Sequence, residues 1–87
     1  MRIYGATSVD PLLSGYCERA LADEAFQSEG MMPDGSFIIS FLADERAWAA
    51  VIGVEKTARQ DDAMLISAVY PVGSEGLAAL VADLKTG

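Results

Sequence analysis

The sequence contains no histidine and a single cysteine, Cys17. The absence of histidine removes the most common general base, the Ser-His-Asp and Cys-His catalytic arrangements and most catalytic zinc sites. A single cysteine excludes an internal disulfide, CxxC redox chemistry and thiolate metal clusters. We therefore expect that the protein is not an enzyme and uses no metal and no cofactor. Carboxylates alone remain for catalysis, and a small enzyme that relies on them is kept as an alternative.

Basic residues are also scarce. Six Lys and Arg stand against thirteen Asp and Glu, which gives a net charge of −7. Nucleic-acid affinity depends on Lys and Arg that displace counterions from phosphates, and anionic membranes attract the same residues. We expect no direct binding to nucleic acid and no docking to a membrane surface.

Long apolar segments are missing as well. No stretch approaches the roughly 20 apolar residues that cross a bilayer, and residues 1–5 show no apolar run of signal-peptide length. A secreted domain of this size usually carries several disulfides, which this chain cannot form. Cytoplasmic localisation is the expectation.

What remains is a chain of 87 residues, of which 52% are hydrophobic, and this length predicts a single domain over residues 1–87. The expected elements are a short strand at 2–6, a helix that begins with Pro11 after the cap Asp10, strands at 36–42, 47–54 and 63–70, and a final helix after the cap Ser74. This order, (β)αβββα, predicts a small α+β domain. We expect a three-stranded antiparallel meander with two helices, most simply laid on one face, and a short fourth strand at the N-terminus.

The first helix carries an apolar stripe with a fault at its end. The stripe at helical spacing consists of Leu12, Leu13, Tyr16, Cys17, Ala20 and Leu21. Continuing this helix would place Glu24 inside the apolar arc and Phe26 outside it. Either the helix ends or bends at residues 22–24, or Phe26 points away from the core as an aromatic anchor among acids. Cys17 lies within the stripe, and we interpret it as a buried, inert thiol.

The meander has two apolar faces, and two helices on one side would cover only one of them. A sheet face in contact with solvent is normally polar. The apolar residues of the second face are Ile38, Leu42, Ala49, Val51, Leu65 and Val69. Three covers are open: a second copy of the chain, another partner, or the first helix if the helices take opposite faces. We expect a homodimer that uses these residues.

Three connections carry turn signals. Residues 30–35 end in Pro-Asp-Gly and predict a loop, and Asp44 with Glu45 predicts a tight turn between two strands. Asp61 and Asp62 lie on a third connection. Neither acidic pair has the ligand spacing of a calcium loop, so we interpret both as solvated turns.

The negative charge is concentrated in the first half of the chain. Residues 1–45 hold eight acidic residues against two basic ones, and residues 46–87 hold five against four. This asymmetry predicts a negatively charged, partly aromatic surface that binds a basic site on a partner protein. The residues expected to bind the partner are Glu18, Asp23, Glu24, Phe26, Glu29, Met31, Met32 and Asp34.

Two function classes follow. In composition the chain resembles small acidic viral anti-restriction and anti-CRISPR proteins, and that resemblance implies an inhibitor that imitates nucleic-acid charge on the basic cleft of its target. The second class is a self-associating structural or accessory subunit that uses the apolar second face. An electrostatic complex weakens as salt rises, whereas a dimer held by an apolar face does not. Salt dependence therefore distinguishes the two classes.

Overall fold

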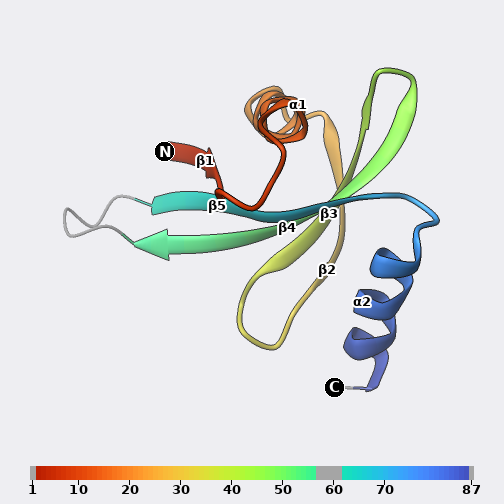
Figure 1. Ribbon diagram of the computed structural model, residues 1–87. Helices are drawn as coiled ribbons and strands as arrows, with labels where there is room; N and C mark the ends of the chain where they lie inside the picture. The colour runs from red at the N-terminus through yellow and green to blue at the C-terminus, as the bar shows by residue number, and fades with distance from the viewer. Residues whose placement is uncertain (1, 57–61, 87) are drawn as a thin grey trace.

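The computed structural model describes residues 2–56 and 62–86, with side chains described within residues 2–55 and 63–82. The fold is a small α+β domain with two helices and a five-stranded sheet, which confirms the predicted fold class (Figure 1). The elements in chain order are β1 (Arg2–Gly5), α1 (Pro11–Ala22), β2 (Phe26–Met31), β3 (Phe37–Ala43), β4 (Arg46–Lys56), β5 (Asp62–Pro71) and α2 (Glu75–Thr86). The predicted acidic connection at Asp61 and Asp62 lies outside the described residues, apart from the backbone of Asp62 at the start of β5.

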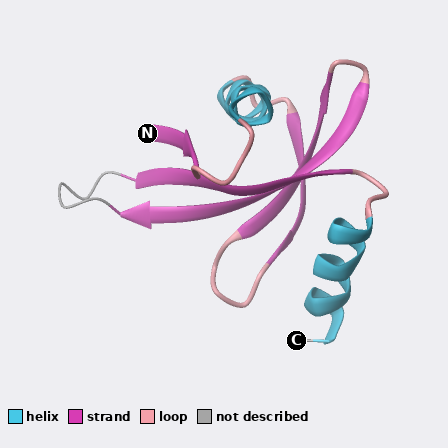
Figure 2. Cartoon of the chain, viewed as in Figure 1, coloured by secondary structure: helices cyan, strands magenta, loops and turns pink. Residues whose placement is uncertain are grey.

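The strands are arranged in the order β1-β5-β4-β3-β2 (Figure 2). The antiparallel meander β3-β4-β5 and the N-terminal strand β1 match the predicted elements, and β1 pairs with β5 in parallel. The sheet contains in addition β2, which pairs antiparallel with β3 and forms one outer edge. The segment Phe26–Met31 contains two polar residues, a glutamate and a glycine, so it shows no strand alternation in sequence. Its pairing with β3 makes it a strand.

Helix α1 begins and ends where the sequence predicts. The carboxylate of Asp10 accepts a hydrogen bond of 2.8 Å from the backbone N–H of Leu12, and Pro11 lies in the first turn. The helix ends at Ala22, and Glu24 adopts a left-handed φ of 56°, which a right-handed helix cannot continue. The first of the two alternatives for this segment is therefore confirmed.

The buried face of α1 differs from the predicted stripe in its first turn. Leu12 is 65% exposed, whereas Ser14 is only 8% exposed. Ser14 lies directly over Gly5 of β1, where an added Cβ would be 2.0 Å from the Ser14 Oγ. A glycine in β1 thus lets α1 approach the sheet through a small polar residue, and this contact turns Leu12 toward solvent.

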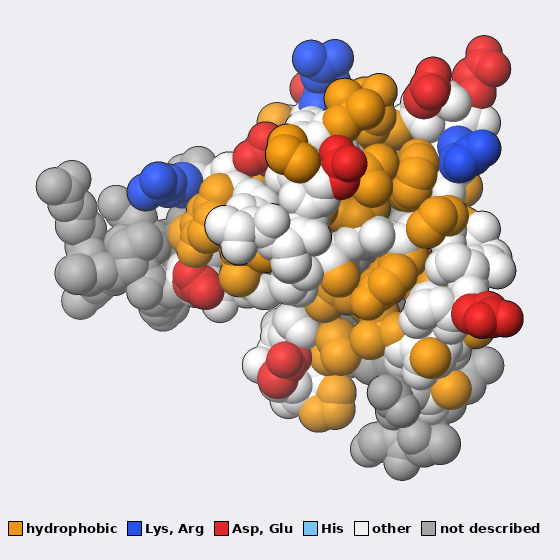
Figure 3. Space-filling model, in the orientation of Figure 1, with side chains coloured by type: hydrophobic (Ala, Val, Ile, Leu, Met, Phe, Trp, Pro, Cys, Tyr) orange, Lys and Arg blue, Asp and Glu red, His pale blue; other side chains and the backbone are white. Residues whose placement is uncertain are grey.

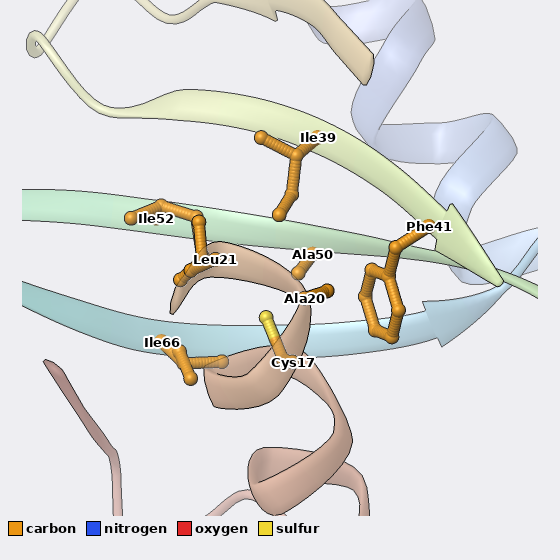
Figure 4. Close-up of a cluster of buried hydrophobic side chains, with 8 residues drawn as sticks. All are labelled: Cys17, Ala20, Leu21, Ile39, Phe41, Ala50, Ile52 and Ile66. Atoms are coloured by element: carbon orange, nitrogen blue, oxygen red, sulfur yellow. The ribbon is translucent and has the colours of Figure 1, made fainter. Parts of the chain in front are cut away.

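The main core lies between α1 and one face of the sheet, called here the α1 face. Its buried cluster consists of Cys17, Ala20, Leu21, Ile39, Phe41, Ala50, Ile52 and Ile66. Figure 4 shows these side chains of α1, β3, β4 and β5 pointing toward one another. Cys17 is fully buried, as predicted, and burial, followed by the charge of Glu18, raises the pKa of its thiol to about 12. The thiol is therefore protonated and unreactive in the folded protein.

A β-bulge in β5 reverses the predicted alternation. Ile52 pairs with Ile66 while Val51 pairs with Ala68, so Ser67 is an extra residue between them. Beyond the bulge, Val69 pairs with Ala50 and packs against the core on the α1 face. The prediction that placed Val69 on the second face is therefore wrong. The hydroxyl of the bulged Ser67 donates a hydrogen bond of 3.1 Å to the carbonyl oxygen of Val51.

The two helices lie on opposite faces of the sheet, with α1 above it and α2 below it in Figure 1. The simplest arrangement, with both helices on one face, is therefore wrong. Ser74 caps α2 through a hydrogen bond of 3.3 Å from the N–H of Leu77 to its hydroxyl oxygen. The ring of Tyr70 packs on Gly76, where an added Cβ would be 3.0 Å from it. This contact anchors the first turn of α2 beside the second face.

Helices of the membrane-spanning kind, long and apolar throughout, do not occur within the described residues.

Candidate functional site

The C-terminal end of α1 and the turn between β3 and β4 enclose a groove of about 280 Å³, called here the acidic groove. Its lining residues are Tyr16, Arg19, Ala20, Asp23, Ala25, Leu42, Ala43 and Asp44. Asp23 follows a helix and Asp44 follows a strand, so tertiary structure brings two separate acids of the first half of the chain to one place. Figure 3 shows acidic side chains on this end of the molecule, over the β3–β4 turn.

The backbone around the acidic groove adopts an unfavourable conformation at three acids. Glu24, Asp44 and Glu45 have φ values of 56°, 53° and 60°, and they are the non-glycine residues with positive φ in the described chain. Asp44 and Glu45 form the predicted tight turn, a two-residue hairpin loop whose positive φ values normally select Asn and Gly. A side chain at such a position costs roughly 1–2 kcal/mol relative to glycine. Glu24 and Glu45 each flank an acid of the groove.

Phe26 does not point away from the core, which is the second of the two alternatives for this segment. It pairs with Phe41 across β2 and β3, is half-buried and packs against the core on the α1 face. The apolar groups that the acidic groove offers instead are Tyr16, which is half-buried, and Leu42, which is 78% exposed. An apolar surface beside acidic residues is therefore present, but Tyr16 and Leu42 form it in place of Phe26. The sequence alone does not show this surface, because its residues come from segments that are distant along the chain.

A second hollow, called here the α2 hollow, has a volume of about 320 Å³ and lies between α2 and the second face of the sheet. Its lining residues are Glu29, Ile38, Ser40, Ala47, Ala49, Val72, Leu77 and Val81. Figure 3 shows apolar side chains gathered between the sheet and α2. Among the side chains that the structure describes, Glu29 is the charged one that lines the hollow, and its carboxylate accepts a hydrogen bond of 2.6 Å from the hydroxyl of Ser40.

The remaining predicted partner-binding residues lie apart from the acidic groove. Glu18 is half-buried on α1, and Met31 is 72% exposed at the far end of β2. Met32 and Asp34 belong to the β2–β3 turn, where the hydroxyl and backbone N–H of Ser36 donate hydrogen bonds to the Asp34 carboxylate and lower its pKa. The length of β2 separates this turn from Asp23. The eight predicted residues therefore do not form one patch, because they are spread over α1, the segment after it, β2 and the β2–β3 turn.

The predicted dimer interface is largely covered within the chain. Ile38, Ala49 and Val51 are only 2%, 3% and 8% exposed. Leu65 is half-buried, and Val69 lies on the α1 face as described above. Leu42 is the member of this set that stays open to solvent. Self-association through the second face remains a prediction, now centred on Leu42 and its surroundings.

Both hollows offer charge and apolar surface to a ligand. Within residues 2–55 and 63–82, no group of three or more Cys, Asp or Glu side chains is placed to hold a metal ion. Each hollow combines an apolar lining with one or two carboxylates, an arrangement that suits a cationic group attached to an apolar stem. Comparison of the chain with protein-family models, with curated protein sequences and with solved structures gives no match.

Proposed function

We propose that this protein binds a partner protein that has a basic surface, and that the acidic groove is the contact site. The observation that carries the proposal is that Asp23 and Asp44, from separate elements, line the same groove beside the exposed Leu42. With Glu24 and Glu45 on the adjoining turns, four carboxylates outnumber the two nearby guanidinium groups, which belong to Arg19 and to Arg46 at the start of β4. Leu42, which lines the groove and is exposed, supplies apolar area for burial in the contact.

Physical reasons favour a binding role at this groove. A net charge of −7 accelerates the approach of a basic partner and slows that of an acidic one. The left-handed acids of the two turns lower stability relative to glycine, and such strain is commonly kept where side chains contribute to function. One class of partner that this charge suits is a nucleic-acid-binding protein, whose basic cleft the acids would occupy in place of phosphates. The lone buried thiol fits a reducing compartment, and the proposed location is the cytoplasm.

The test is a comparison of charge-neutralised variants with a partner captured from the native host lysate. Asp23→Asn with Asp44→Asn is expected to slow association about tenfold at low salt, and the difference should shrink near about 0.5 M salt. The matched control is Asp34→Asn with Glu75→Gln, which removes the same charge on surfaces away from the groove. If the control slows association as much as the groove variant, the net charge acts as a whole and the groove is not the site.

A second candidate function, self-association, is favoured by Leu42, which is 78% exposed, and by Val72, which is 52% exposed. A dimer held by these apolar side chains should persist as salt rises. Sedimentation equilibrium of the wild-type protein and of Leu42→Glu checks it. A strict monomer at high protein concentration would remove this candidate and leave Leu42 to a different partner.

A further inference from the structure

The outer edge of β2 is available for pairing. In the described chain β2 is the terminal strand of the sheet, and its partner β3 lies on one side only. The side chains of Gln27, Ser28 and Glu29 are exposed. An outer strand presents backbone N–H and C=O groups to solvent, and extended segments of other proteins bind such edges by adding a strand.

Gly30 opens this edge toward the α2 hollow. It pairs with Ile38, which lines the hollow, so the missing side chain belongs to the same face. A Cβ at Gly30 would have no atom within 4 Å, and Gly30 is not among the glycines with positive φ. Neither close packing nor backbone geometry requires a glycine here. Its effect is a gap between the strand edge and the hollow.

The hollow behind this gap matches a long cationic side chain. Its walls are apolar, from Ala47, Ala49, Leu77 and Val81, and Glu29 places a carboxylate at its margin. Lys and Arg bury an aliphatic stem along apolar surfaces and keep the charged group at the polar end. A charge-assisted hydrogen bond to the carboxylate would hold that group.

Charge also selects against a second copy of β2 as the added strand. Two copies paired antiparallel about the middle of this short strand would bring the two Glu29 carboxylates near each other, and like charges across a strand pair destabilise it. The bulge between Ser28 and Gly30 also interrupts the regular spacing of backbone groups along this edge. A basic segment meets no such repulsion.

We propose that an extended basic segment of the partner adds as a strand to β2 and inserts a Lys or Arg side chain past Gly30 into the α2 hollow, with its cationic group on Glu29. This inference rests on the proposed function, because it assumes a basic partner. It goes beyond that function because it specifies how the partner binds, by strand addition, and a second contact surface that is separate from the acidic groove.

The experiment is an NMR titration of the full-length, ¹⁵N-labelled protein with a synthetic peptide of about ten residues in which arginine alternates with valine. A peptide with glutamate in place of arginine is the control. The arginine peptide is expected to shift the backbone amides of β2 and of Ser40 and to give cross-strand contacts to β2. The glutamate peptide should leave them unchanged.

Two variants test the position of the inserted side chain. Gly30→Val fills the gap and is expected to weaken binding of the arginine peptide at least about tenfold, while Glu29→Gln removes the charge that holds the cation. Ser28→Val is the matched control, since it adds the same side chain to the same strand on the α1 face, opposite Ile39. Unchanged affinity in Gly30→Val would overturn the proposal. If Gly30→Val fails to fold, unchanged affinity in Glu29→Gln overturns it in the same way.

The pattern of shifts separates this inference from the proposed function. Shifts confined to Asp23, Asp44 and their neighbours would overturn strand addition and leave the acidic groove as the site for a basic partner. No shift at either surface would count against both. Shifts of the β2 amides that depend on protein concentration, without peptide, would identify a second copy as the added strand and overturn the basic segment.

Discussion

The phenol of Tyr4 in β1 donates a hydrogen bond to the carboxylate of Glu55 near the end of β4, across the intervening strand β5. Ala63 of β5 pairs with Glu55 and lies on the same face of the sheet as this hydrogen bond. It is only 2% exposed. The guanidinium of Arg2 lies 5.7 Å from the centre of the Tyr4 ring. These contacts tie the short N-terminal strand to the meander on the second face.

The Tyr4–Glu55 hydrogen bond predicts a loss of stability at alkaline pH. The bond to Glu55, followed by burial, raises the pKa of Tyr4 above its ordinary value of 10.0. Because the folded-state pKa is the higher one, the contribution is complete below pH 10.0 and is lost as pH rises through the folded-state pKa. Urea unfolding of the wild type and of Tyr4→Phe should therefore show a stability difference that shrinks above this pH. A difference that stays constant across the alkaline range would contradict the assignment.

Two glycines of the α1 region should respond oppositely to the same substitution. Gly5→Ala is expected to destabilise the protein, because the new Cβ would be 2.0 Å from Ser14 Oγ and α1 would have to move. Gly15→Ala adds its Cβ in open space within α1 and should stabilise by about 1 kcal/mol through helix propensity. Thermal unfolding measures both. Equal effects of the two substitutions would show that Ser14 does not pack over Gly5 as described.

The positive φ of Glu45 predicts that replacing this residue by glycine raises stability and weakens binding. Glu45→Gly should raise the free energy of unfolding by about 1 kcal/mol, since glycine adopts a φ of 60° without steric cost. Glu45→Ala is the control: it removes the same charge, keeps a Cβ and should not stabilise. Both variants are expected to associate with the basic partner more slowly than the wild type. A stabilised glycine variant with unchanged association kinetics would show that Glu45 takes no part in binding.

The buried thiol of Cys17 predicts protection from modification. With a pKa of about 12 and no exposed surface, it should react with a thiol reagent only when the chain unfolds. Labelling at neutral pH should therefore follow the unfolding equilibrium and accelerate in urea. Cys17→Ser is expected to lower the free energy of unfolding by about 1–3 kcal/mol, because it buries a hydroxyl among the apolar side chains of the cluster. Fast labelling of the native protein would contradict this burial.

The elements with strong local signals follow from the sequence alone. Asp10 and Pro11 determine the start of α1, and the conflict between Glu24 and Phe26 marks its end, because capping and helical periodicity are properties of adjacent residues. The three strands of the meander are likewise predictable from alternating apolar residues. The charge asymmetry is also present in the sequence, and it indicated acids of the first half of the chain as candidates for binding.

Tertiary structure decided the features that depend on pairing between distant segments. The bulge at Ser67 moves Val69 to the other face, since one extra residue inverts every side chain beyond it. β2 is a strand because β3 offers it hydrogen bonds, although its own residues show no strand pattern. The acidic groove exists because the end of α1 folds against the β3–β4 turn and brings Asp23 to Asp44. Local propensity fixes where elements begin and end, whereas burial and backbone hydrogen bonding between elements determine which side chains share a surface.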